Sequence, residues 1–221
     1  MRLTAKSTLA DIALTVGARL QRHGITAVLT GGACVSVYTD GSYVSKDADY
    51  VLQGTIRQSD LDTALAALGF ARRGDRYVHA VVPFYLEFPP GPLAIGTDID
   101  IQPVEVTVAG GSALLLSPTD SCRDRLAAFY HWQDRQSLSL AVAIARHQAI
   151  DLAVIREWSR DEGSGAGYEE FLRELRRDRR ANPPERRSRR AGPRKTTASR
   201  EDTVVGRQHR RRIGLPPHRR R

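Results

Sequence analysis

The chain has 221 residues and a formal net charge of +9. This length accommodates one ordinary domain with an extension and excludes two full catalytic domains, since domains usually span about 100–200 residues. The charge is unevenly distributed: residues 171–221 hold 19 Lys or Arg against 5 Asp or Glu, whereas residues 1–170 hold 15 against 20. The basic character therefore belongs to the C-terminal segment, and the part before it is mildly acidic.

Cysteine content and hydropathy exclude other classes of protein. Cys34 and Cys122 are the only cysteines, too few for a disulfide scaffold or for a zinc site built on Cys pairs. We expect reduced thiols in a cytoplasmic protein. The first amphipathic segment contains Asp11, which argues against a signal sequence. No run approaches the ~18 apolar residues that a membrane span needs, so no membrane partner is expected.

The first half of the chain alternates helical and extended patterns. Apolar residues at helical spacing follow Ser7 or Thr8 and stop at Gly24, which predicts a first helix. A β-branched apolar run then ends at Gly31-Gly32 and predicts a buried strand that enters a tight turn. Beyond it the patterns predict helices over 33–38 and 59–68 and strands over 47–52, 76–79 and 83–88.

The second half changes from strand to helix. One or two further strands are expected over 99–101 and 104–108, ending at Gly110-Gly111, and helical patterns begin at Ser117 and recur over 137–146 and 151–160. Residues 168–180 are helical in pattern but with little to bury. From about residue 181 the chain is rich in Pro, Arg and Ser and cannot bury enough surface to order itself.

These patterns predict an α/β (α+β) fold with a small mixed sheet, flanking helices, a C-terminal helical segment and a disordered tail. The expected division is 1–116 for the sheet domain, 117–165 for the helical segment, and 166–221 for the Arg/Pro-rich linker and tail.

Two aspartates on a predicted strand are the main candidates for a functional site. Side chains at i and i+2 of a strand share one face, so Asp47 and Asp49 project together while Ala48 points away. Paired carboxylates at this spacing are typical of a divalent cation site, and their oxygens suit Mg²⁺. Gly31 and Gly32 lack Cβ atoms, so a phosphate can approach their backbone and the next helix N-terminus.

The stretch Leu29-Thr30-Gly31-Gly32-Ala33, followed by Ser45-Lys46-Asp47-Ala48-Asp49-Tyr50-Val51, resembles the nucleotidyltransferase superfamily over roughly residues 8–90. The signature of that superfamily is a Gly-Gly turn, a carboxylate-x-carboxylate pair and a third carboxylate on a later strand. The resemblance implies that Asp47 and Asp49 hold Mg²⁺ and that Gly31 and Gly32 hold a nucleoside triphosphate, with Ala33 and Lys46 beside it.

One residue departs from the superfamily pattern. Ala33 stands where a phosphate-contacting Ser is common, which puts active catalysis in doubt but not the fold. Other small residues occur here in the toxin-like branch of abortive-infection systems. Similarity to that branch implies an antitoxin-like protein partner.

The third carboxylate is open to two assignments. Glu87 lies in an apolar strand at the expected topological place and is the first choice as metal ligand and catalytic residue. Asp98 and Asp100, a second i, i+2 pair, are the rivals. Further along, Asp124 and Arg125 are substrate-site candidates.

The helical segment that contains Asp124 and Arg125 is also dense in aromatic residues. Trp132 and Tyr130 could stack on a base, and His131 or Arg135 could reach a phosphate. Ordinary helix packing with surface ion pairs is the alternative interpretation of the same residues.

We therefore predict a metal-dependent nucleotidyltransferase that moves a nucleoside monophosphate from a triphosphate to an acceptor hydroxyl. The alternative is a catalytically silent module of the same fold that binds a protein or nucleic acid. A third hypothesis makes the tail a nucleic-acid tether, since its Arg runs at 186–190 and 209–212 would attract phosphate backbones.

Overall fold

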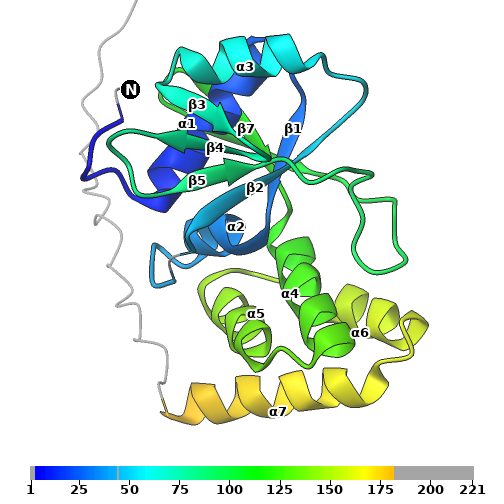
Figure 1. Ribbon diagram of the computed structural model, residues 1–221. Coiled ribbons are helices and arrows are strands. Elements are labelled where there is room, and N and C mark those ends of the chain that lie inside the picture. Colours follow the sequence, from blue (N-terminus) through cyan, green and yellow to red (C-terminus); the bar gives the residue numbers. More distant parts are fainter. Residues whose placement is uncertain (1–2, 44, 182–221) are drawn as a thin grey trace, which may run out of the picture. The chain divides into compact units, whose positions relative to one another are not determined.

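Seven strands of the described chain form one mixed sheet, in the order β3-β4-β5-β2-β1-β7-β6 (Figure 1). The computed structural model describes residues 3–43 and 45–181. The strands are β1 Ala27–Thr30, β2 Asp47–Leu52, β3 Phe70–Arg73, β4 Arg76–His79, β5 Tyr85–Glu87, β6 Val104–Val108 and β7 Gly111–Leu115. The helices are α1 Leu9–Arg22, α2 Gly31–Tyr38, α3 Gln58–Ala66, α4 Pro118–Trp132, α5 Arg135–His147, α6 Leu152–Asp161 and α7 Gly165–Ala181.

Helix α1 packs on the sheet through one apolar face. Thr8 and Asp11 form a capping box, in which each side chain bonds the other residue's backbone N–H. At Gly17 the helix comes so close to β7 that an added Cβ would lie 2.8 Å from the Ala113 Cβ. The Tyr50 hydroxyl donates to the Ala13 carbonyl (2.6 Å) and fastens β2 to the same helix. The central strands are thus held against a fixed layer.

The register of β2 positions the candidate site. It pairs antiparallel with β1 on one side and parallel with β5 on the other. The first of these pairings sets Thr30 opposite Asp49, and the second sets Asp49 opposite Glu87. Ala48 and Tyr50 are fully buried and face away from the aspartates. The alternation expected from the sequence therefore holds over this strand.

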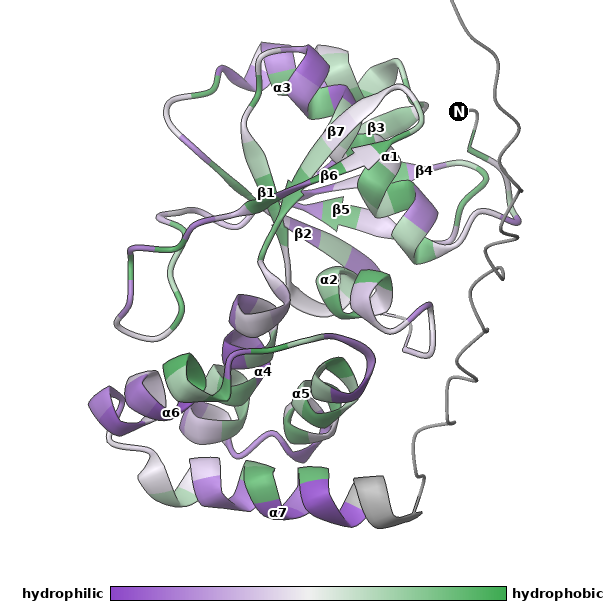
Figure 2. Ribbon diagram, turned by 180° about the vertical axis from the view of Figure 1, so that it is seen from behind, coloured by the Kyte–Doolittle hydropathy of each residue, from purple (hydrophilic) through white to green (hydrophobic). Residues whose placement is uncertain are grey.

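Helices α4 to α7 form a second layer, which α2 contacts through α4 and α5. Ser117 caps α4 and Asp151 caps α6, both through side-chain oxygens that accept backbone N–H groups. The Tyr38 hydroxyl donates to the Leu116 carbonyl (2.5 Å), so the end of α2 is tied to the start of the helical layer. Along α7, apolar and polar positions alternate (Figure 2).

Three elements differ from the sequence predictions, and residues 99–101 do not form the strand that was expected there. The edge strand β3 was not expected; only Phe70 of it is buried. Gly110 and Gly111 do not end the sheet but lie where β6 turns back into β7. The expectation that α7 has little to bury is wrong, because Tyr168, Phe171 and Leu175 belong to the core.

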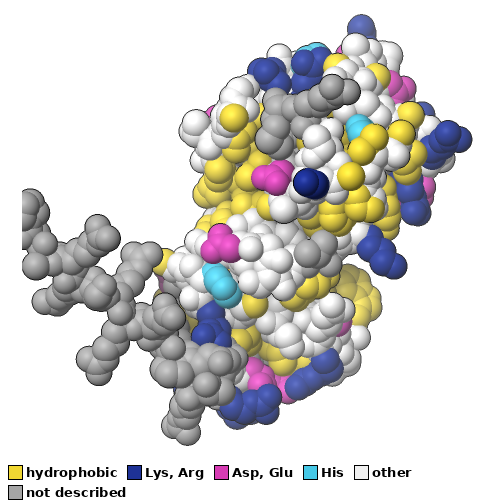
Figure 3. All heavy atoms as spheres, turned by 90° about the vertical axis from the view of Figure 1, so that its left-hand side faces the viewer, with side chains coloured by type: hydrophobic (Ala, Val, Ile, Leu, Met, Phe, Trp, Pro, Cys, Tyr) yellow, Lys and Arg dark blue, Asp and Glu magenta, His cyan; other side chains and the backbone are white. Residues whose placement is uncertain are grey.

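The remaining observations concern charge and hydropathy. On the face in Figure 3, the described Lys and Arg side chains are scattered and form no continuous band. Among residues 3–43 and 45–181, no helix is long and apolar enough to cross a bilayer. The Arg runs of the predicted tail lie outside the described residues.

Candidate metal and nucleotide site

Three carboxylates converge on one edge of β2 and β5. Asp47 and Asp49 come from β2, and Glu87 comes from β5 because the parallel pairing places it opposite Asp49. One oxygen of each lies within 4.8 Å of the others, and all three side chains are half-buried. The structure thus brings together the pair and the first-choice third carboxylate.

The cluster carries negative charge that its surroundings do not neutralise. The pKa of Asp49 is raised to about 6, first by burial and then by the charges of Asp47 and Glu87. Arg125 acts on Asp49 in the opposite direction but does not cancel these effects. A cation bound between the carboxylates would relieve the repulsion.

Two hydroxyls orient Asp47. Ser45 Oγ donates to Asp47 Oδ1 (2.6 Å), and the Tyr85 hydroxyl donates to Asp47 Oδ2 (3.1 Å). The hydrogen bond from Tyr85 to Asp47 is the main cause that raises the Tyr85 pKa, so the phenol remains a donor. Neither residue was singled out in the sequence. Each stands two positions before a cluster carboxylate, so period-two spacing could have indicated them.

Glu87 has a cationic neighbour. Arg76 Nη2 lies 3.8 Å from Glu87 Oε1, because β4 pairs with β5 in a register that sets the two residues opposite each other. The same guanidinium stacks over the Tyr85 ring at 4.6 Å. Both partners of the ion pair are partly exposed, so the arginine holds Glu87 only weakly.

The glycine pair shapes the site in a way the sequence did not indicate. Gly31 has φ +63°, and a Cβ there would collide with the Asp49 carboxylate. At Gly32 a Cβ would lie 2.8 Å from the Ser45 Cβ. Both glycines and Ala33 are buried, within the first turn of α2 rather than in a separate turn. The missing side chains make room for the carboxylates and for Ser45, while Lys46 is exposed.

The rival pair lies elsewhere. Asp98 forms an ion pair with the buried Arg123, which also bonds Asp120 at 2.8 Å. The hydrogen bond from Arg123 is the main cause that lowers the pKa of Asp98. Asp100 is exposed and accepts a hydrogen bond from Gln102. Arg123 thus binds Asp98 of the loop to α4, and both Asp98 and Asp100 lie outside the three-carboxylate cluster.

Arg125 lies on α4 and acts electrostatically on the cluster. Its side chain is 19% exposed and pairs with Asp124 at 2.6 Å. Burial opposes its ionisation, but Asp124 and, more weakly, Tyr43 and Asp49 outweigh burial and raise its pKa. A permanent cation therefore stands within electrostatic reach of Asp49.

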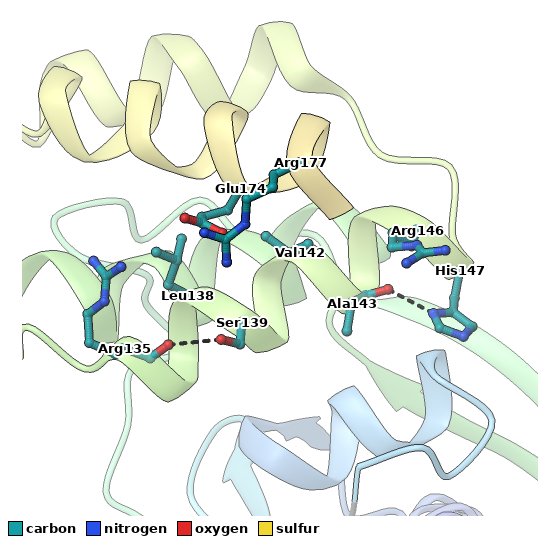
Figure 4. Close-up of a pocket in the computed structure, with 9 residues that line it drawn as sticks. All are labelled: Arg135, Leu138, Ser139, Val142, Ala143, Arg146, His147, Glu174 and Arg177. Carbon is teal, nitrogen blue, oxygen red and sulfur yellow. Dashed lines mark hydrogen bonds and ion pairs between the residues drawn. The ribbon is translucent and has the colours of Figure 1, made fainter. Parts of the chain in front are cut away.

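A groove of about 560 Å³ lies between α5 and α7, away from these residues. Figure 4 shows Arg135 and Arg146 on α5 and Glu174 and Arg177 on α7 around it. No cluster carboxylate and no residue that acts electrostatically on Asp49 lines it, so we assign it no part in the site.

The donor set fits a hard divalent cation. Three carboxylate oxygens, half-buried and mutually repelling, are ligands that Mg²⁺ prefers, and they leave further positions for water or phosphate oxygens. Soft nitrogen or sulfur ligands that would favour other metals are absent from this cluster.

Similarity to known proteins is found among solved structures. No family model and no curated protein matches the sequence. Among solved structures, an antigenic nucleotidyltransferase-like protein from Paracoccidioides brasiliensis is similar, with TM-score 0.55 and 16% identity over 80% of this chain and 91% of that chain. ANT(2″)-Ia in complex with adenylyl-2″-tobramycin gives TM-score 0.38 and 14% identity over 71% and 92%.

The first of these similarities defines the class of fold. The chain has a nucleotidyltransferase-like fold: a mixed sheet with flanking helices, as the sequence predicted. At 16% identity the similarity speaks for the fold alone. What the carboxylate cluster does follows from its chemistry.

Proposed function

We propose that the protein transfers a nucleoside monophosphate from a nucleoside triphosphate to an acceptor hydroxyl. The observation that carries the proposal is the convergence of Asp47, Asp49 and Glu87 within 4.8 Å, with the pKa of Asp49 raised to about 6. Perturbed carboxylates gathered at one edge of a sheet are typical of functional sites. The nucleotidyltransferase-like fold supports the same chemistry.

Each residue has a defined task in this reaction. Asp47 and Asp49 hold Mg²⁺, with Asp47 oriented by Ser45 and Tyr85. When bound, the metal neutralises the phosphate oxygens and orients them for in-line attack. Glu87 either completes the metal's ligands or takes the proton of the attacking hydroxyl.

The bond changes balance simply. The acceptor oxygen forms a bond to the α-phosphorus and gives its proton to Glu87 or to water, the bond from that phosphorus to the bridging oxygen breaks, and pyrophosphate leaves with the electron pair. Gly31, Gly32 and Ala33 place the first turn of α2 beside Asp49. Helix α2 has no side-chain cap, so its N-terminal amides are suited to a phosphate. Lys46, which is exposed and directly precedes Asp47, is proposed to contact a phosphate.

Calorimetry of the full chain tests the proposal. ATP, GTP, CTP and UTP are titrated with and without MgCl₂ into the wild type, the Asp47→Asn/Asp49→Asn variant and an Asp100→Asn control. We expect Mg²⁺-dependent binding of at least one triphosphate, lost in the double variant and retained in the control. A double variant that binds as well as the wild type would refute the assignment of the cluster.

A second candidate is a catalytically silent module that uses the same fold to bind a protein or nucleic acid. The observation that favours it is the burial of Gly31, Gly32 and Ala33, with Ser45 directly over Gly32. This candidate predicts no Mg²⁺-dependent triphosphate binding in the same titration, and no pyrophosphate release with any acceptor. An antitoxin-like partner, or nucleic acid held by the basic tail, belongs to this candidate.

A further inference from the structure

A groove of about 470 Å³ runs along α4, a helix that packs against α2. One wall is the 94–97 segment, and the other is a single face of α4. Arg125 lines the groove. Trp132 lines it two helical turns further on, about 10 Å along the axis at 1.5 Å per residue. No cluster carboxylate lines the groove, but Asp124 and Arg125 both line it and act electrostatically on Asp49, so they connect it to the place proposed for the phosphates.

Trp132 is unusual among the described residues. It is 76% exposed, although it ends a helix whose other large apolar side chains, Leu126 and Phe129, are buried. The indole makes a T-shaped contact with the His131 ring, with centroids 6.2 Å apart, and both residues line the groove. An exposed aromatic platform in a groove is suited to stacking against a flat ring.

The acidic side chains of the groove already have partners. Asp124 pairs with Arg125 at 2.6 Å, and the Glu162 carboxylate meets His131 Nε2 at 3.2 Å. The rest of its lining is small or apolar, including Ala94, Ile95, Ala127 and Ala128. Since neither carboxylate lacks a partner, the groove favours a neutral ligand over a polycation.

Hydrogen bonds to Glu162 hold the 94–97 segment, which forms the wall opposite α4. Glu162 Oε1 accepts from both the Thr97 backbone N–H (2.6 Å) and the Thr97 hydroxyl (2.7 Å), while Oε2 meets His131. At Gly96, φ +60°, a Cβ would collide with the same carboxylate. The Glu162 side chain is only 2% exposed. Its contacts therefore fix the shape of the groove, and Trp132 forms the exposed side.

We infer that this groove is the nucleobase subsite of the triphosphate, with Trp132 as the stacking residue. The inference rests on the proposed function, because the phosphates must lie at the carboxylate cluster for the base to extend along α4. A neutral, flat ring attached to a polyphosphate matches a groove whose carboxylates already have partners and whose lining includes Arg125. Volumes of about 300–1,000 Å³ are usual for small-ligand sites.

The test separates the ring from the phosphates. Dissociation constants of the four nucleoside triphosphates, the four nucleosides and inorganic tripolyphosphate are measured with MgCl₂ on the full chain. The proteins are the wild type, Trp132→Ala, Trp132→Phe and a Val81→Ala control, whose side chain is also exposed but lies outside the groove. Circular dichroism checks that each variant folds.

We expect Trp132→Ala to weaken the preferred nucleoside triphosphate and its nucleoside by about five- to a hundredfold, the range that loss of one stacked base produces. Trp132→Phe restores most of the affinity, and tripolyphosphate binds equally well to all four proteins. The chain has two tryptophans, and Trp158 is buried, so the nucleoside also quenches an emission that Trp132→Phe removes.

Unchanged triphosphate affinity in Trp132→Ala overturns the inference while leaving the proposed function intact. The opposite separation is also visible: nucleosides that bind through Trp132, without Mg²⁺-dependent binding of tripolyphosphate or triphosphates, support the subsite and refute the proposed function. Failure of every probe overturns both.

Discussion

Two acidic pairs in this chain have the same spacing and opposite electrostatics. Asp47 and Asp49 stand beside a third carboxylate, and the pKa of Asp49 is raised to about 6. Asp98 and Asp100 have the same i, i+2 pattern, but Asp98 is bound by Arg123 and its pKa is lowered. The comparison shows that the pattern alone does not indicate a metal site. The deciding feature is whether the fold places a cation in direct contact with one of the two aspartates, as it places Arg123 against Asp98.

The largest expected effect comes from removing the cation of the second pair. Arg123 has a side chain only 6% exposed, bonds Asp98 and Asp120, and stacks 5.1 Å from the Trp158 ring. Arg123→Met keeps much of the packing but leaves two carboxylates without their partner. We expect the free energy of unfolding to fall by about 3–5 kcal/mol in urea titrations.

The matched control for this variant is Arg160→Met. Arg160 is 72% exposed and also forms ion pairs with two carboxylates, Glu157 and Asp161. Because exposed pairs contribute little, its replacement is expected to change stability by about 0.5 kcal/mol or less. Equal losses in the two variants would contradict a structural role for the buried Arg123.

The next effect concerns the glycine beside the first pair. Gly31→Ala places a side chain at φ +63° and against the Asp49 carboxylate. We expect a loss of about 2–3 kcal/mol, of which about 1–2 is the left-handed backbone. Gly54→Ala is the control, because Gly54 has φ +78° with open space around its Cβ position. A loss at Gly31 no larger than at Gly54 would show that Asp49 makes way without cost.

The sequence predicted the strand that carries Asp47 and Asp49, but it did not show the strand pairing that completes the cluster. The shared face of Asp47 and Asp49 was predicted by strand alternation, and β2 has the expected bounds. The convergence of Glu87 depends on β5 pairing parallel to β2, a contact across 38 residues that no local pattern encodes. Glu87 was preferred over Asp98 on topological grounds, and only the register set it opposite Asp49.

Other elements were missed for identifiable reasons. Strand β3 ends in two exposed arginines, so it lacks an alternating apolar face. Strand β7 begins at Gly111, which was interpreted as the end of β6. Arg123 was overlooked as a partner of Asp98, because the two residues meet only when the loop packs on α4.

Asp49→Asn is expected to have a smaller effect on the free energy of unfolding, and to raise it rather than lower it. The folded-state pKa of Asp49, about 6, exceeds its ordinary value of 3.8. The folded protein thus holds the proton more tightly than the unfolded chain, and stability falls as pH rises from about 4 to about 6. In EDTA at pH 8 the Asn variant should be more stable by about 1–2 kcal/mol, after allowance for partial exposure.

Thermal melts over pH 4–8 check this sign. The stabilisation by Asp49→Asn should grow as pH rises through about 6 and should be smallest near pH 4, where the wild-type carboxyl is protonated. Added Mg²⁺ should raise the melting temperature of the wild type but not of the variant, since a ligand that binds the folded state stabilises it. A wild type more stable than the variant at pH 8 in EDTA would contradict the repulsion inferred for the cluster.

The smallest effect is expected at Asp100, and it sharpens the comparison most directly. Asp100 matches Asp49 in its pattern, two residues after another aspartate, but it is exposed and its contacts are hydrogen bonds with Asp98 and Gln102. Asp100→Asn keeps an oxygen acceptor, so the free energy of unfolding should change by about 0.5 kcal/mol or less at any pH from 4 to 8. If Asp100→Asn stabilised the protein at pH 8 as Asp49→Asn does, the second pair would also carry unneutralised charge, and Arg123 would not be the feature that distinguishes the two.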